Sequence, residues 1–203
     1  GIDTVGKHDT IKAVQAKTMQ NRRTGMNDTI QVLKQRRSVR SYRPEPIRQE
    51  ELDAVLEAGS WAPSAMGRQS VTMVVLREKD QIQRLSRYNA AVMGTDSDPF
   101  YGAPVVVVVL ADPEATNSVN AVCDGALVMG NLMNAAWSLG IGSCWINRAR
   151  EVFEKPEGKV LLREWGLPER YIGVGNCVLG YPAAVVEPGH PRKENGIIYP
   201  SGK

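Results

Sequence analysis

Four arginines stand within eight residues of this sequence, in the stretch RRSVRSYR over positions 36–43. Guanidinium groups so close together repel one another unless a negative group lies among them, and Ser38 adds a hydroxyl donor. Forked guanidinium donors with a hydroxyl suit a phosphate monoester, and Arg192 and Lys193 offer a second basic group. The alternative is a solvated basic helix end, because the helix dipole favours cations at a C-terminus. Both interpretations stay open on these residues alone.

The chain has few residues for metal or nucleophile chemistry of its own. It contains two histidines near opposite ends and three widely spaced cysteines, Cys123, Cys144 and Cys177. No pair of them has metal-ligand spacing, so we expect no metal site, no catalytic side chain, and cysteines that are reduced, buried thiols. If the protein catalyses a reaction, we therefore expect a bound cofactor to supply the reactive group.

Positive charge is concentrated near the start of the chain. Residues 1–43 hold ten Lys and Arg against three Asp and Glu, whereas the rest hold fifteen against nineteen. A basic end can bind nucleic acid, but Tyr42 is its only aromatic residue, so base stacking has little to use. No apolar run approaches the length of a membrane-spanning helix. No signal peptide is expected, and Gly1 resembles the remnant of a cleaved tag. We expect a cytoplasmic protein without nucleic-acid or membrane partners.

The order of elements predicts one mixed α+β domain over residues 27–203, preceded by an N-terminal arm over residues 1–26. Within the arm, the polar segment 9–23 could be a surface helix or lie on a partner. Asn27 or Asp28 can cap a short first helix. Further helices are expected at 48–59, 80–89, 118–139, 151–154 and 157–165, and strands at 70–78, 103–112, 141–147 and 171–182.

The longest expected helix, 118–139, is rich in Ala, Gly and Met, which predicts a central position packed close to other backbone. Its three- and four-residue spacing predicts one buried face. The residues expected on that face are Val119, Val122, Ala126, Met129, Met133 and Ala136.

Five motifs follow one another in an order and spacing typical of one protein family. They are RRSVRSY, SWAPSAMGRQS, YGAPVVVVV, GNLMNAAWSLGIGSCWI and a terminal RK, and the likeness covers roughly residues 28–199. The chain therefore resembles the FMN-dependent nitroreductase family. The resemblance implies a nitroreductase-like fold, with a central, mainly antiparallel sheet flanked by helices. It also implies a homodimer in which residues 196–199 add a strand to the partner's sheet.

By the same resemblance, the anion among the arginines is FMN. The implied cofactor-binding residues are Arg36, Arg37, Ser38, Arg40, Pro63, Ser64, Ala65, Gln69, Trp145, Ile146, Asn147, Arg192 and Lys193. The arginine run would hold the phosphate and the pyrimidine side of the flavin, and residues 63–65 would reach it from the other subunit. Backbone amides around residues 145–147 would face the flavin N5 and O4. Candidate walls of a substrate pocket are Met93, Phe100 and Tyr101, with ordinary packing under a loop as the alternative.

The expected activity is an oxidoreductase reaction. NADH or NADPH would pass hydride through FMN to a small electron-poor acceptor, such as a nitroaromatic or a quinone, in ping-pong order. The alternatives are other flavin chemistry of the same fold, namely ene reduction, flavin destruction or dehalogenation, or a flavin-binding module without turnover. Gly67 and Gly130 stand where the family commonly has asparagine and glutamine. Gly130 suggests close backbone approach at the dimer core, or altered packing on the flavin ring.

Overall fold

The computed structural model describes residues 27–200. The chain divides into two compact units, residues 1–36 and residues 37–203. The expected N-terminal arm, with its segment 9–23, lies outside the described residues. The domain boundary expected after residue 26 therefore stays a prediction.

The described part of the first unit is helix α2 (Asp28–Gln35). Its N-cap is Asn27, whose side chain accepts a hydrogen bond from the Ile30 amide at 3.0 Å. That contact satisfies one of the free amides of the first turn. Arg36 closes the helix, and its amide donates to the Val32 carbonyl at 2.9 Å. The expected short helix is confirmed, with Asn27 as its cap.

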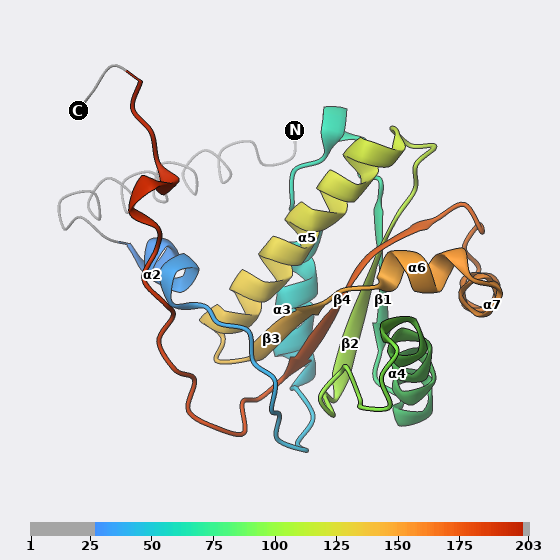
Figure 1. Ribbon diagram of the computed structural model, residues 1–203, viewed down its shortest axis with the longest axis horizontal. Helices are drawn as coiled ribbons and strands as arrows, with labels where there is room; N and C mark the ends of the chain where they lie inside the picture. Colours follow the sequence, from blue (N-terminus) through green and yellow to red (C-terminus); the bar gives the residue numbers. More distant parts are fainter. Residues whose placement is uncertain (1–26, 201–203) are drawn as a thin grey trace, which may run out of the picture. The chain divides into compact units, whose positions relative to one another are not determined.

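The second unit is built on a four-stranded sheet in the order β1-β2-β4-β3 (Figure 1). The strands are β1 (Val71–Leu76), β2 (Val105–Ala111), β3 (Gly142–Ile146) and β4 (Ile172–Gly180). Every neighbouring pair is antiparallel, with one register shift between Val109 and Leu110. The expected α+β class with an antiparallel sheet is confirmed. Strands β1 and β3 form the two edges.

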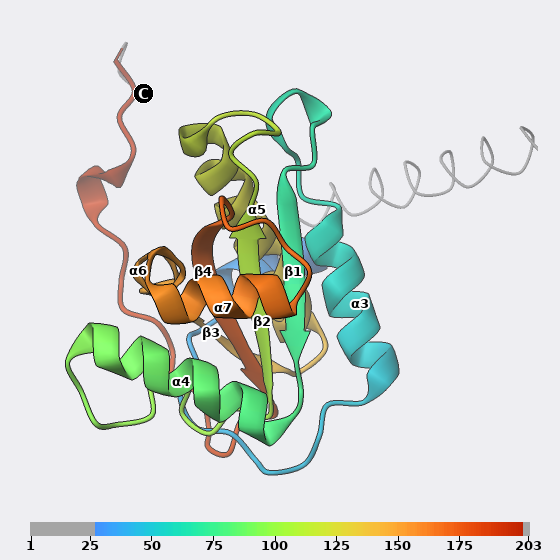
Figure 2. The same cartoon turned by 90° about the vertical axis from the view of Figure 1, so that its right-hand side faces the viewer.

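Helices cover both faces of this sheet (Figures 1 and 2). One face carries α3 (Gln49–Ser60) and α5 (Ser118–Ser138). The other face carries α4 (Lys79–Met93), α6 (Ala149–Glu154) and α7 (Pro156–Glu164). Two short 3-10 turns complete the unit, η2 (Ala65–Gly67) and η3 (Glu194–Gly196).

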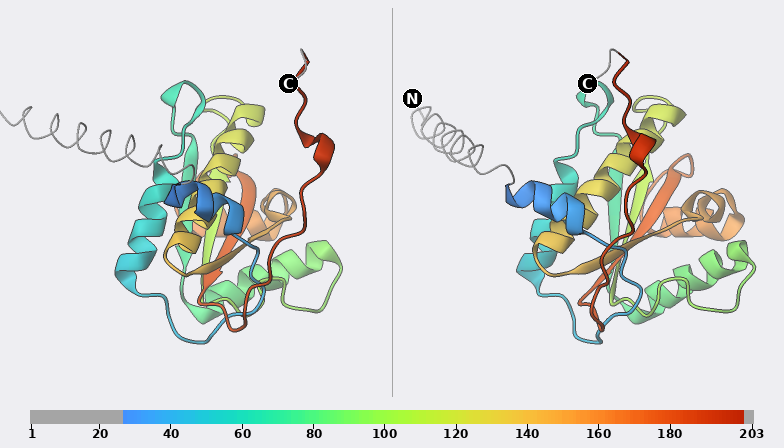
Figure 3. Two further views of the ribbon diagram at one scale, coloured as in Figure 1. Left: turned by 90° about the vertical axis from the view of Figure 1, so that its left-hand side faces the viewer. Right: turned by 60° about the vertical axis from the view of Figure 1, so that its left-hand side comes forward.

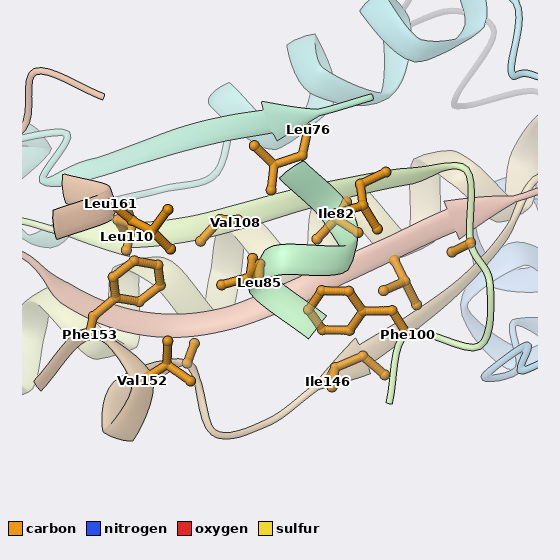
Figure 4. Close-up of a cluster of buried hydrophobic side chains, with 14 of the residues drawn as sticks. Leu76, Ile82, Leu85, Phe100, Val108, Leu110, Ile146, Val152, Phe153 and Leu161 are labelled. Atoms are coloured by element: carbon orange, nitrogen blue, oxygen red, sulfur yellow. The ribbon is translucent and has the colours of Figure 1, made fainter. Parts of the chain in front are cut away.

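The valine-rich strand β2 explains why both faces need a cover. It is buried along its whole length, and successive side chains point to opposite faces. Val106, Val108 and Leu110 join the cluster beneath α4, α6 and α7, where Phe100 and Phe153 also pack (Figure 4). The alternate residues of β2, from Val105 to Val109, join the cluster beneath α3 and α5.

The buried face of α5 differs from the face expected. Val119, expected inside, is 72% exposed. Val122, Ala126 and Met133 are only half-buried, whereas Met129 and Ala136 are buried as predicted. The observed buried face consists of Ala121, Asp124, Gly125, Val128, Met129, Leu132 and Ala136. Because α5 is apolar almost all round, its spacing did not determine which side meets the sheet. The expectation for Cys123 is also wrong, because this rotation leaves it exposed while Cys144 and Cys177 are buried.

Beyond β4, the described chain continues as a tail (residues 183–200) that leaves the sheet (Figure 3). Apart from η3 it has no regular element. Ile197, Ile198 and Tyr199 are exposed by 74%, 80% and 57%. These apolar side chains have no core of their own, and the expected strand exchange stays a prediction.

Candidate functional site

Residues 37–43, here called the arginine segment, meet the start of the edge strand β3 and then the chain that follows β4. Ser38 forms a parallel bridge with Ser143, and the Val39 amide donates to the Ser143 carbonyl at 2.9 Å. A methyl group added at Gly142 would lie 2.8 Å from the Val39 Cβ, so the two backbones lie in close contact. Val39 is buried, whereas Ser38 and Arg40 on either side are exposed, as the alternation of an extended chain requires. The segment thus presents a hydroxyl and a guanidinium on its outward side.

Tyr42 and its neighbours hold the C-terminal end of the arginine segment in place by hydrogen bonds. The Tyr42 hydroxyl donates to the Val39 carbonyl at 2.5 Å. Burial raises the pKa of the Tyr42 hydroxyl well above its ordinary value, so this hydroxyl loses its proton even less readily than an exposed tyrosine. The neighbouring Arg43 amide donates to the Tyr181 carbonyl at 2.9 Å, and the Ala183 amide donates to the Ser41 carbonyl at 3.0 Å. The segment is therefore held between β3 and the chain that follows β4.

The tail meets the arginine segment at Gly189. A methyl group added there would lie 2.5 Å from Cζ of Arg37, so the tail backbone passes directly over that guanidinium. Arg192 and Lys193 follow a few residues later and are exposed. Arg36 belongs to the first unit as the C-cap of α2, and its predicted role stays a prediction.

The end of β3 offers backbone donors. β3 pairs with β4 on one side only, and the Ser143 carbonyl points away from β4 toward Val39. In an antiparallel pair, every second residue directs its amide and carbonyl outward, so the next outward residue of β3 is Trp145. Ile146 instead turns its backbone toward β4 and buries its side chain in the core. Asn147 lies beyond the end of β3, and the predicted contact of amides around Trp145–Asn147 with flavin stays a prediction.

The predicted residues Pro63, Ser64, Ala65 and Gln69 lie together in the α3–β1 loop (residues 61–70). The Ser64 hydroxyl accepts a hydrogen bond from the Gln69 amide at 2.9 Å. The Ala65 amide donates to Oδ1 of Asp124 at 2.8 Å, which ties the loop to α5. Met66, Gly67 and Gln69 all have positive φ angles. The loop is a compact turn with a defined backbone.

The single chain does not bring this loop to the arginine segment. The loop meets α5 at Asp124, whereas the arginine segment meets Gly142, just beyond the other end of that helix. Asp124 and Ser138 are separated by 14 residues, which is about 21 Å of helix. The loop also leads into β1, at the sheet edge opposite β3. The predicted flavin contacts thus form two separate groups on the single chain.

The predicted substrate-pocket residues separate into surface and core. Met93 and Tyr101 are exposed by 49% and 41%. Phe100 is fully buried in the core beneath α4 (Figure 4). For this residue, the alternative of ordinary packing under a loop therefore holds. Asp98 shapes this loop, because its carboxylate accepts hydrogen bonds from the Ser86 hydroxyl at 2.5 Å and the Phe100 amide at 2.9 Å. Whether Met93 and Tyr101 face a substrate stays a prediction.

A large hollow lies elsewhere on the second unit. Its volume is about 980 Å³, and it lies between α4, the loop after α4 and the segment around Pro44 and Pro46. None of the predicted site residues lines it. Its lining mixes Arg77, Lys79 and Arg87 with Glu78, Asp96 and Asp98 and thus favours no particular charge. Size alone therefore does not make it the functional site.

Within residues 27–200, no group of three or more His, Cys, Asp or Glu side chains could hold a metal ion. None of the helices described is long and apolar enough to cross a membrane. The sequence reasoning missed Asp124, although a signal was present: it is the one charged residue in the 21 residues of α5.

Comparison with known proteins adds to this geometry. The model of the nitroreductase family matches residues 33–95 and 91–181. The FMN reductase (NAD(P)H) of Bacillus subtilis is 32% identical over 172 residues, which are 78% of this chain and 67% of that protein. A nitroreductase with bound FMN from Bacteroides fragilis superimposes with a TM-score of 0.77 at 30% identity, covering 86% of this chain and 99% of that one. A nitroreductase with bound FMN from Desulfitobacterium hafniense gives a TM-score of 0.76 at 28% identity, covering 86% and 98%.

Proposed function

Because the chain belongs to the nitroreductase family, we propose that it binds FMN and reduces small electron-poor molecules at the expense of NAD(P)H. The observation that carries the proposal is the arginine segment joined to β3 at Ser143, with Ser38 and Arg40 exposed on either side of the buried Val39. FMN carries a phosphate monoester and a polar ring edge, and this donor set suits both. The solved relatives from Bacteroides fragilis and Desulfitobacterium hafniense contain FMN.

Each residue has a distinct role in this proposal. Arg37 and Arg40 supply fixed positive charge for the phosphate and for the ring edge that becomes negative on reduction, and Ser38 donates a hydroxyl. Backbone amides around Trp145 to Asn147 orient the ring. When bound, FMN supplies the hydride transfer between NAD(P)H and a nitroaromatic or quinone acceptor. No side chain of the protein is required as an obligatory acid or base.

We also propose that the active form is a homodimer. The α3–β1 loop and the arginine segment lie too far apart to share one flavin within a subunit, but two subunits can each supply one group. Large apolar side chains around this loop and on α5 are exposed, as expected of a surface that a partner covers. They are Trp61, Met66, Val119 and Leu127. The exposed apolar triplet of the tail offers the partner a further contact.

Replacing Arg40 by alanine tests the flavin assignment. The loss of one charge-assisted contact should weaken FMN binding by about 1.5–3 kcal/mol, which is roughly ten- to one hundred-fold in Kd. Arg150→Ala is the matched control, because Arg150 is an exposed arginine whose ion pair with Glu154 lies on α6. Kd is measured by quenching of flavin fluorescence on the apoprotein. Equal Kd values for the two variants would contradict the assignment.

A second measurement separates an enzyme from a flavin-binding module. Anaerobic addition of NADH or NADPH to the flavin-loaded protein should bleach the flavin absorbance. Adding nitro, quinone and enone acceptors one at a time should then restore it, and the fastest acceptor identifies the substrate class. A loaded protein that neither nucleotide bleaches would contradict turnover and favour the binding module.

A further inference from the structure

Asp124 is the one charged residue of α5, and its side chain is almost fully buried at 3% exposure. A carboxylate is strongly disfavoured in such a place unless hydrogen bonds replace the water that it loses. Its neighbours in the helix are apolar or small, so the contacts that it makes outside α5 must account for it.

Both carboxylate oxygens of Asp124 are used, and both hold the same loop. Oδ1 accepts from the Ala65 amide at 2.8 Å, and Oδ2 accepts from the buried Ser70 hydroxyl at 2.7 Å. The helix that carries the carboxylate is itself fixed, because a methyl group at Gly125 would lie 2.5 Å from Cγ2 of Val174 on β4. One rigid group therefore sets the distance between two points of the α3–β1 loop.

Between those two points the backbone adopts conformations that residues with side chains avoid. Met66 and Gln69 have φ angles of 54° and 50°, in the left-handed region. Such a conformation is sterically unfavourable for any residue with a side chain. Gly67, with φ 67°, adopts it more easily. The loop keeps this shape because surrounding contacts hold it, and the two hydrogen bonds to Asp124 are charge-assisted and therefore the stronger kind.

We propose that Asp124 is a positioning residue for the cofactor: it holds the α3–β1 loop in the shape that contacts the flavin of a second subunit. The inference rests on the proposed function, in which the flavin-contacting residues of that loop are Pro63, Ser64, Ala65 and Gln69. Asp124 itself need not touch flavin. Its effect reaches the cofactor through the Ala65 backbone and the Ser70 side chain.

The first test compares FMN binding by full-length apoproteins. Asp124→Ala removes both hydrogen bonds and should raise the Kd for FMN about tenfold or more. Asp124→Asn keeps one acceptor oxygen and should recover part of the affinity. The matched control is Asn131→Ala, since Asn131 also lies on α5 and donates to a backbone carbonyl, that of Ala58, at 2.9 Å. This control should lower thermal stability and leave the Kd for FMN unchanged.

The second test reads the loop without any flavin. Arg68 is exposed between the two points that Asp124 holds, so trypsin cleavage after Arg68 reports local opening of the loop. In apoprotein, Asp124→Ala should speed this cleavage several-fold, whereas Asn131→Ala should not. Mass spectrometry of the fragments identifies the cleaved bond.

The outcomes separate the two proposals. If wild-type protein binds FMN and Asp124→Ala binds it equally tightly, this inference is overturned and the proposed function stands. If Asn131→Ala weakens FMN binding as much as Asp124→Ala, the effect is general destabilisation, which also overturns it. If wild-type protein does not bind FMN, the proposed function fails and the flavin role of Asp124 fails with it.

Discussion

Replacing Gly125 by alanine should destabilise the protein, whereas the same change at Gly130, five residues along the same helix, should stabilise it. At Gly125 the added methyl group would lie 2.5, 2.9 and 3.0 Å from Cγ2, Cγ1 and Cβ of Val174. At Gly130 it would meet nothing within 4 Å. Both changes gain about 1 kcal/mol of helix propensity. Only the first also forces α5 and β4 apart.

The size of the difference follows from these contacts. Overpacking a well-packed core costs about 1–3 kcal/mol, and the upper end applies because the branched Val174 side chain is struck at its Cβ and cannot turn away. Gly125→Ala should therefore lose about 2 kcal/mol of unfolding free energy after the helix gain is included. Gly130→Ala should gain up to about 1 kcal/mol. The two variants should differ by about 3 kcal/mol.

Urea denaturation followed by circular dichroism measures both values, at protein concentrations where the two variants have the same oligomeric state. Val174→Ala in the Gly125→Ala background should restore part of the loss, so the double variant should be more stable than the sum of the single changes predicts. The reasoning is refuted if Gly125→Ala is as stable as wild type, or if Val174→Ala brings no relief. A loss at Gly130 that appears only in the dimer would place a partner's backbone over that residue.

Hydrogen bonds from Arg48 and Tyr181 lower the pKa of Glu51 from its ordinary 4.5 to about 2. The ionised Glu51 therefore stabilises the fold fully above pH 4.5, and this stabilisation is lost as the pH falls toward 2. In Glu51→Gln, the free energy of unfolding should therefore depend less on pH between 4.5 and 2 than in wild type. An unchanged pH dependence in that range would count against this role of Glu51. Replacing all three cysteines by serine should leave turnover per bound FMN intact in a steady-state assay; a collapse would indicate thiol chemistry. Truncation after Gly189 should weaken both dimerisation and FMN binding in sedimentation and flavin titration, and a stable flavin-loaded dimer would contradict the role of the tail.

Much of the fold could be predicted because local patterns were strong. The valine run of β2 is too apolar for anything except a strand covered on both faces, and Asn27 has the side chain that an N-cap needs. The face of α5 could not be predicted from spacing, because almost every side of that helix is apolar. Its orientation depends on one carboxylate and one glycine: Asp124 has its partners in a loop some 60 residues away, and Gly125 allows contact with Val174.

The candidate site shows the same division. The arginine segment and the α3–β1 loop each form a short motif, so the sequence alone identifies them. Their separation on the single chain depends on strand order and on the length of α5, which no short motif contains. Phe100 illustrates a further limit, because an aromatic residue in a polar loop can fill the core when Asp98 turns the backbone inward.

The position of the arginine segment also limits how this sheet can grow. An exposed edge strand is a template onto which another extended chain can add, and uncontrolled addition leads to aggregation. On β3 the arginine segment already occupies that template at Ser143, so the residues proposed for the cofactor also block the edge. On β1, no described residue pairs with the side opposite β2. A fifth strand, from the tail of a second copy as proposed or from any other extended peptide, would therefore pair with β1 and leave the arginines untouched.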